Sequence, residues 1–209
     1  MAFYNDSDDV TTNFVISFSS NPQQDFGKFA EGYRNAAKLL AENLLSKVHI
    51  GDNEAYPVVF LYRHAFELYL KDYFYWIVLI RFFSNLTTLW PKFVTQHQLT
   101  PIAKYILDAV SQLFPNDLDV IKKAKNFYDT ALEFDQIDPN SFGYRYPTDK
   151  NGNYSTPHHQ IVNLGSFYEH MEEVMGELEI FDFGLNVEAD NRQISYELIE
   201  EVKKYLGIK

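Results

Sequence analysis

The sequence contains no cysteine, and this absence limits the chemistry that the chain can perform. It excludes disulfide bonds, thiol nucleophiles and thiolate metal sites, and it fits a reducing compartment, so we expect a cytoplasmic protein. The nucleotide-binding loops GxGxxG and GxxxxGK[ST], the GxSxG nucleophile elbow and the HExxH zinc motif are absent as well. We therefore expect neither a cofactor nor a bound metal.

Long apolar runs are also missing. The longest, residues 73–80, is far too short to cross a bilayer, and extending it backwards meets Asp72, Lys71 and Glu67. Residues 1–9 are polar and acidic, whereas a signal peptide starts basic and then turns apolar. The sequence therefore predicts a protein without a membrane span or a targeting signal.

Positive charge is scarce: 18 Lys and Arg stand against 29 Asp and Glu, which gives a net charge of -11. Lys122, Lys123 and Lys125 come nearest to a basic cluster, and we interpret them as the solvated side of a helix. This balance disfavours nonspecific nucleic-acid binding, and we expect no DNA partner. An RNA site in a locally basic cleft stays compatible with it.

Aromatic residues are abundant, at 17% of the chain with 18 Phe and 15 Tyr, and hydrophobic residues reach 46%. This composition argues against disorder. A chain of 209 residues is long enough to bury one sizeable core built from large rings. We therefore expect a single domain across residues 1–209.

Apolar residues recur at helical spacing along most of the chain. The predicted helices span residues 25–47, 57–83, 100–113, 118–134, 164–180 and 194–206. In this prediction Pro57 lies in the first turn of its helix and Asp117 caps the next but one. The sequence thus predicts an all-α bundle of about five to six helices. It also has an N-terminal arm at 1–22, where a short β element could form, and a long polar loop at 135–160.

Four ionisable residues lie inside the most apolar of these helices: Arg63, His64, Glu67 and Lys71. Their spacing of three and four places them near one another on a buried helix, where charges must be paired. In one interpretation His64 is a general acid or base, and Arg63 or Lys71 stabilises an anionic transition state. In the other, which we favour, the stripe is a buried salt-bridge network that orients helices.

The loop at 135–152 is the second candidate. Its chemistry-bearing side chains are Asp135, Asp138, Tyr144, Arg145 and Tyr146. Tyr144 and Tyr146 are expected to sandwich the Arg145 guanidinium, and either aspartate could fold back onto Arg63 or Arg145. An arginine between aromatic rings could bind phosphate or a stacked base. The favoured alternative is a clasp that packs the loop over the bundle.

Several histidines suggest a metal site, but their spacing in the sequence does not fit one. His158 and His159 are adjacent and so point apart, and neither they nor Asp149 and His170 form a helical ligand pair. His97 precedes a predicted helix, and we expect it near the N-cap or packed on the loop. No metal site is predicted.

Three segments together resemble bacterial HEPN-like helical proteins: residues 62–71 (YRHAFELYLK), 97–102 (HQLTPI) and 138–152 (DPNSFGYRYPTDKNG). The resemblance covers about residues 25–180. It implies a bundle of about five helices, often a homodimer, and a link to RNA cleavage, toxin–antitoxin pairs and antiphage defence. Active members cleave RNA without metal, using an arginine followed four to six residues later by a histidine. No arginine of this chain has a histidine at that spacing, and Arg63 and His64 are adjacent.

Three functions follow from these observations. The first is a non-catalytic or weakly active HEPN-like protein that acts by binding RNA or a protein, as a homodimer, with a structural stripe. The second is a metal-independent ribonuclease in which His64 is the general base, Arg63 steadies the phosphate and Arg145 closes from the loop; a dimer could bring two stripes together. The third is a small-ligand binder with an aromatic cleft beneath the 135–160 loop.

Overall fold

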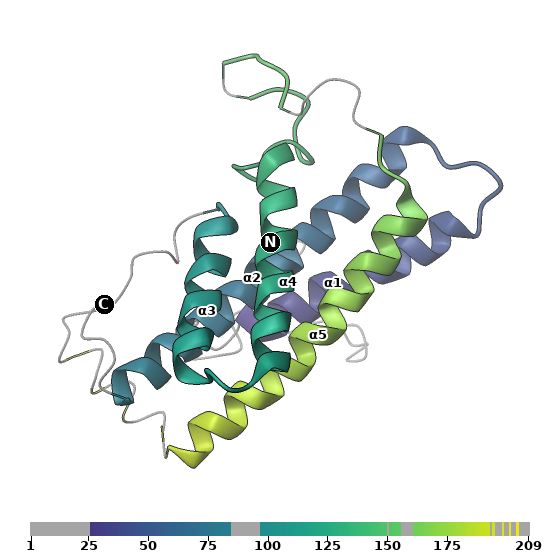
Figure 1. The fold of residues 1–209 in the computed structure, drawn as a ribbon. Coiled ribbons are helices and arrows are strands. Elements are labelled where there is room, and N and C mark those ends of the chain that lie inside the picture. Colours follow the sequence, from purple (N-terminus) through teal and green to yellow (C-terminus); the bar gives the residue numbers. More distant parts are fainter. Residues whose placement is uncertain are drawn as a thin grey trace, which may run out of the picture.

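The computed structural model describes residues 26–84, 97–149, 151–155 and 161–192, together with the separate residues 194, 198, 201 and 204. Within these ranges the chain forms five α-helices and no strand, which confirms the all-α prediction (Figure 1). The predicted N-terminal arm at 1–22 and most of the predicted helix at 194–206 lie outside the described residues. None of the described helices has the length and apolar character needed to cross a membrane.

The helices are α1 (Phe26–Leu45), α2 (Asp52–Phe83), α3 (Thr100–Leu113), α4 (Leu118–Ile137) and α5 (Leu164–Asn191). Helix α2 packs against α1, α3 and α5, whereas α4 packs against α3 and α5. Figure 1 shows α3 and α4 side by side, joined by a short turn, and the loop after α4 extending beyond its end. The long helix α2 is therefore the element that most of the bundle shares.

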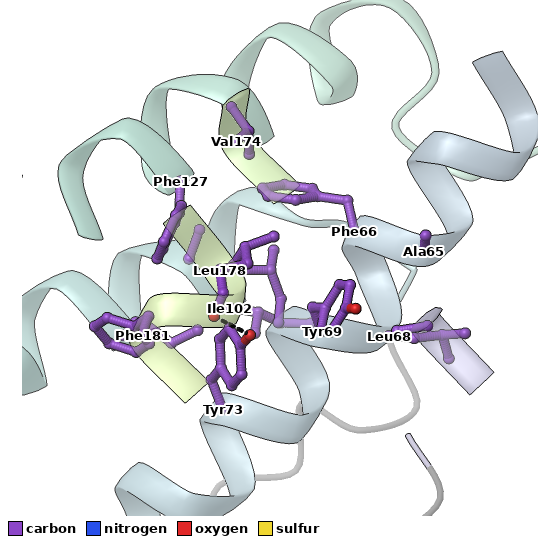
Figure 2. Packing of buried hydrophobic residues seen from close by; sticks show 14 of the residues in the cluster. Ala65, Phe66, Leu68, Tyr69, Tyr73, Ile102, Phe127, Val174, Leu178 and Phe181 are labelled. Atoms are coloured by element: carbon purple, nitrogen blue, oxygen red, sulfur yellow. Dashed lines mark hydrogen bonds between the residues drawn. The ribbon is translucent and has the colours of Figure 1, made fainter. Parts of the chain in front are cut away.

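Helix α2 is buried on most sides, as its sequence predicts. Its rings pack against residues of α4 and α5, including Phe127, Leu178 and Phe181 (Figure 2). Tyr73 is fully buried, and its hydroxyl donates a 2.6 Å hydrogen bond to the carbonyl oxygen of Leu178. This bond satisfies a polar group that burial would otherwise penalise.

Three helix boundaries differ from the prediction. Helix α4 runs to Ile137 rather than to residue 134, so the first residues of the predicted 135–160 loop are helical. Helix α2 begins at Asp52, five residues before Pro57. Its first turn is acidic, and the Glu54 carboxylate accepts a 3.0 Å hydrogen bond from the Gly51 N–H, so this end is stabilised without proline. Helix α5 continues to Asn191 because Phe181 and Leu185 prolong its buried stripe.

Candidate functional site

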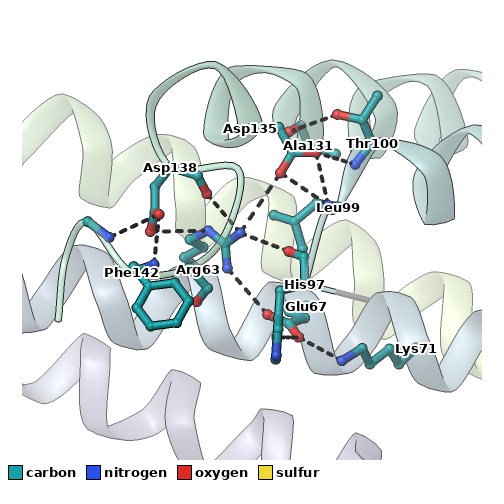
Figure 3. A network of polar contacts seen from close by, with 12 residues as sticks. Arg63, Glu67, Lys71, His97, Leu99, Thr100, Ala131, Asp135, Asp138 and Phe142 are labelled. Atoms are coloured by element: carbon teal, nitrogen blue, oxygen red, sulfur yellow. Dashed lines mark hydrogen bonds and ion pairs between the residues drawn. The ribbon is translucent and has the colours of Figure 1, made fainter. Parts of the chain in front are cut away.

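Arg63 is fully buried on α2, at the point where the end of α4 and the segment before α3 meet that helix (Figure 3). Its Nη2 donates to the carbonyl oxygens of His97 and Asp138, each at 3.0 Å. Its Nη1 donates to Glu67 Oε2 at 3.3 Å. The carboxylates of Asp135 and Asp138 lie 3.8 Å from Nη2 and 3.9 Å from Nε, respectively. The guanidinium is therefore held between three carboxylates and two backbone carbonyls.

Glu67 is the anionic centre of this network. Its Oε1 accepts a 2.6 Å hydrogen bond from Lys71 Nζ and lies 3.1 Å from His97 Nδ1. Burial opposes ionisation, but the charges of Lys71 and Arg63 and the hydrogen bonds of Lys71 and His97 hold the pKa of Glu67 below its usual range. The stripe thus contains a buried carboxylate that is paired and ionised at neutral pH.

The two aspartates also fix the backbone around the network. Asp135 accepts hydrogen bonds from the Leu99 and Thr100 N–H groups, the latter at 2.7 Å, and so caps α3 from α4. Asp138 Oδ1 accepts from the N–H groups of Phe142 and Gly143 at 2.8 and 3.0 Å, which shapes the start of the loop. Both aspartates fold back toward Arg63, as the sequence led us to expect.

Asp135→Ala is expected to lower the free energy of unfolding by about 1 to 2 kcal/mol. The substitution leaves the first N–H groups of α3 without their acceptor and removes one carboxylate from the Arg63 guanidinium. Urea unfolding measures the loss. The matched control is Asp129→Ala on the same helix, because Asp129 is exposed and pairs along α4 with Lys125. Equal losses in the two variants would contradict the capping role.

His64 lies apart from the Arg63 network, although it is the next residue. Its half-buried ring packs edge-on against Tyr33 of α1, with centroids 4.4 Å apart, and stacks with Phe60 at 5.7 Å. Burial is the largest contribution and lowers the pKa of His64; the Glu67 charge opposes this shift, whereas the charges of Lys71, Arg145 and Arg63 add to it. His64 is therefore neutral at physiological pH and faces α1 rather than the carboxylates.

Arg145 is exposed on the loop, and aromatic rings surround it. Its guanidinium carbon lies 5.2 Å from the Phe142 centroid, 5.8 Å from that of Tyr146 and 5.6 Å from that of Phe60. Its Nε donates a 2.6 Å hydrogen bond to the Ser141 carbonyl oxygen. The predicted sandwich therefore includes Tyr146, but the prediction for Tyr144 is wrong.

Tyr144 turns the other way, because the turn at Phe142 carries Arg145 outward while Tyr144 packs on α2 beside Tyr56. It lines a cleft of about 330 Å³ together with Tyr56, Val59 and Ile137. This cleft lies beneath the loop, where the small-ligand alternative places one. That alternative stays a prediction.

The structure thus places the three residues predicted to be catalytic in two different environments. Arg63 is enclosed in the buried network, whereas His64 and Arg145 both contact the Phe60 ring near the surface. Six residues were predicted to form a polar network. Tyr144 instead packs beside Tyr56, and Tyr146 packs beside Phe142. Glu67, Asp135 and Asp138 do surround Arg63, and Lys71 pairs with Glu67. This arrangement can orient α2, α3, α4 and the loop relative to one another.

Sequence reasoning missed a second cluster of carboxyl groups. Asp72 of α2 and Asp182 of α5 line a cavity of about 530 Å³ near the start of α1. Burial and the nearby Asp182 charge raise the pKa of Asp72 to about 7, and burial raises the pKa of Asp182. The sequence did contain an indication of this cluster. Asp72 lies in the buried helix, and the residues three and four positions away supply no basic partner: they are Leu68, Tyr69, Tyr75 and Trp76.

Metal ligands do not gather in the part of the chain that the structure covers, which holds no group of three or more His, Asp or Glu suited to a metal ion. His170 lies 3.4 Å from the Thr130 hydroxyl, and Asp149 accepts hydrogen bonds within its own turn. His158 and His159 lie outside the described residues.

Comparisons of the chain with models of protein families, with curated proteins and with solved structures found no match. The HEPN-like resemblance therefore rests on the three sequence segments quoted above and stays a prediction.

Proposed function

We propose that this protein acts by binding rather than by catalysis, as a non-catalytic HEPN-like helical protein. The observation that supports this proposal best is the burial of Arg63 together with its hydrogen bonds. Its guanidinium is fully buried, and both of its terminal nitrogens donate hydrogen bonds within the protein. An arginine that stabilises a transition state must instead present its N–H groups to the reacting phosphate.

The charges around Arg63 support the same proposal. Glu67, Asp135 and Asp138 surround one guanidinium, with Lys71 as the only other cation that the described contacts place beside Glu67. Three carboxylates near two cations give a net negative potential, which repels a phosphodiester. A substrate phosphate would also have to displace backbone carbonyls that hold the loop and the start of α3 in place.

The remaining features of the proposal come from the sequence. We propose a cytoplasmic homodimer that binds RNA or a protein in a toxin–antitoxin or antiphage-defence setting, as the HEPN-like resemblance implies. The net charge of -11 favours a partner with a basic surface. Analytical ultracentrifugation tests the dimer directly, and a monomer at micromolar concentration would contradict that part.

One observation favours a second candidate, a metal-independent ribonuclease. His64 and Arg145 share contact with Phe60, and His64 is held neutral, as a general base must be. In this candidate Arg145 contacts the phosphate, and Arg63 has only a structural role.

Incubation of the purified protein with total RNA and tRNA in EDTA separates the two functions. We expect no cleavage above that of a mock purification from cells without the protein. His64→Ala and Arg145→Ala serve as variants because neither residue belongs to the buried network. Cleavage by the wild type that disappears in both folded variants would overturn the binding proposal and establish the ribonuclease.

A further inference from the structure

The cavity at Asp72 differs from the polar sites around Glu67 and Glu172, because within the described residues no ion pair joins its buried carboxyl groups to a basic side chain. Glu67 pairs with Arg63 and Lys71, and Glu172 of α5 pairs with Arg34 and Lys38. Accordingly, although burial opposes ionisation at both glutamates, their partners hold the pKa of each below its usual range. Buried carboxylates elsewhere in the described chain are thus matched by basic side chains.

Asp72 and Asp182 are not paired with basic side chains in this way within the described residues. Asp72 is only 7% exposed, and its carboxylate accepts a hydrogen bond from the Gly27 N–H. Asp182 accepts a 3.0 Å hydrogen bond from Asn186. Neither carboxyl group forms an ion pair with a basic side chain of the described ranges. Asp72 is therefore a nearly enclosed acid at the wall of an open cavity, with its charge uncompensated.

The groups that face Asp72 come from three helices. From α1 these are Lys28 and Glu31, and from α5 they are Glu179 and Asp182. On α2 itself, Tyr69 and Trp76 also line the cavity. Glu179 is already paired with Arg34. Even with Lys28 counted, the lining carries an excess of negative charge.

The walls of this cavity indicate which kind of cation fits. Aromatic faces such as those of Tyr69 and Trp76 attract alkylammonium groups, whose methylene chains also bury apolar surface against them. The acidic groups line one space but do not gather into a set of three that could hold a metal ion. A volume of about 530 Å³ also suits a small organic ligand. Spaced carboxyl groups and aromatic walls favour an extended organic cation over a point charge.

We propose that the cavity between the start of α1, the middle of α2 and the second half of α5 binds an aliphatic polyamine, with Asp72 and Asp182 receiving its ammonium groups. The inference goes beyond the proposed function, because none of the residues around Arg63 lines this cavity. Bound ammonium groups offset the negative charge that remains in the lining after Lys28 is counted. Binding also ionises Asp72, so uptake of the ligand releases a proton near neutral pH.

Isothermal titration calorimetry with spermidine at about 0.15 M salt tests the proposal. Asp72→Asn and Asp182→Asn are each expected to weaken spermidine binding at least about tenfold. Both substitutions keep the side-chain shape and remove charge that burial disfavours, so both variants should fold. Asp129→Asn on the exposed side of α4 removes the same charge elsewhere and should leave the affinity unchanged. The uncharged 1,4-butanediol should not bind.

Titrations in two buffers of different ionisation enthalpy provide a second readout. The wild type should release a proton on binding spermidine at neutral pH, and Asp72→Asn should release less. The proposal is overturned if spermidine does not bind, if Asp129→Asn weakens binding as much as Asp72→Asn, or if Mg²⁺ at equal ionic strength displaces the polyamine. RNA cleavage would refute the non-catalytic function without bearing on the cavity, and absent spermidine binding would refute the cavity proposal alone.

Discussion

Arg63→Met is expected to lower the free energy of unfolding by about 3 to 5 kcal/mol, the largest effect that we expect of any single substitution. Methionine fills a similar volume but supplies no charge. It leaves the buried Glu67 with Lys71 as its remaining close cation, and the carbonyls of His97 and Asp138 each lose the hydrogen bond from Arg63. Urea unfolding followed by circular dichroism gives the free energy and its denaturant slope.

The matched control for this substitution is Arg192→Met. Arg192 lies exposed at the end of α5, pairs along the helix with Glu188 and donates a 2.6 Å hydrogen bond to the Ser84 hydroxyl. Exposed pairs of this kind contribute about 0.3 to 0.5 kcal/mol and an exposed hydrogen bond about 1 kcal/mol, so the control should lose far less stability than Arg63→Met. If Arg63→Met were as stable as Arg192→Met, the structural role of Arg63 would be wrong.

Asp72→Asn is expected to stabilise the protein increasingly as the pH rises. The pKa of Asp72 is raised from 3.8 to about 7 because burial and the Asp182 charge disfavour the carboxylate. The folded state therefore keeps a proton that the unfolded chain releases, and wild-type stability falls as the pH rises from about 4 through 7. A pKa raised by about three units corresponds to a loss of about 4 kcal/mol of folding stability above pH 7. Asparagine does not titrate, so the variant does not suffer this loss.

The measurement is the difference in free energy of unfolding between Asp72→Asn and wild type at pH about 5 and about 8. The advantage of the variant should grow by about 2 to 3 kcal/mol between these two conditions. Asp129→Asn, which changes an exposed carboxylate, should show almost no such growth. A constant difference across this range would mean that Asp72 ionises normally and that the cavity does not disfavour its charge.

The sequence was sufficient to predict the ion pairs, the burial and the cap that depend on residues of a single helix. Arg63, Glu67 and Lys71 are four residues apart along α2, and helical geometry alone makes them neighbours. Burial of α2 followed from its wide apolar surface. The Asp117 cap was predicted for the same reason, since its side chain accepts from the Val120 N–H three residues ahead.

Contacts between helices were predicted less well, because no local spacing encodes them. His64 was placed with Glu67 on the basis of a separation of three, but the packing of α1 turns its ring toward Tyr33. Asp72 and Asp182 are 110 residues apart in the chain, and they line one cavity only because α5 packs on α2. The aromatic partners of Arg145 likewise depend on a turn in the loop.

A double-mutant cycle of Arg63→Met and Glu67→Leu tests the central claim, that Arg63 serves the fold, most directly. If the two side chains act as one buried network, each single variant is strongly destabilised, and the double variant loses less than the sum by about 2 kcal/mol or more. If the losses are small and additive, Arg63 is not held by Glu67 in solution. Its guanidinium would then be available to a ligand, and the non-catalytic proposal would lose its main support.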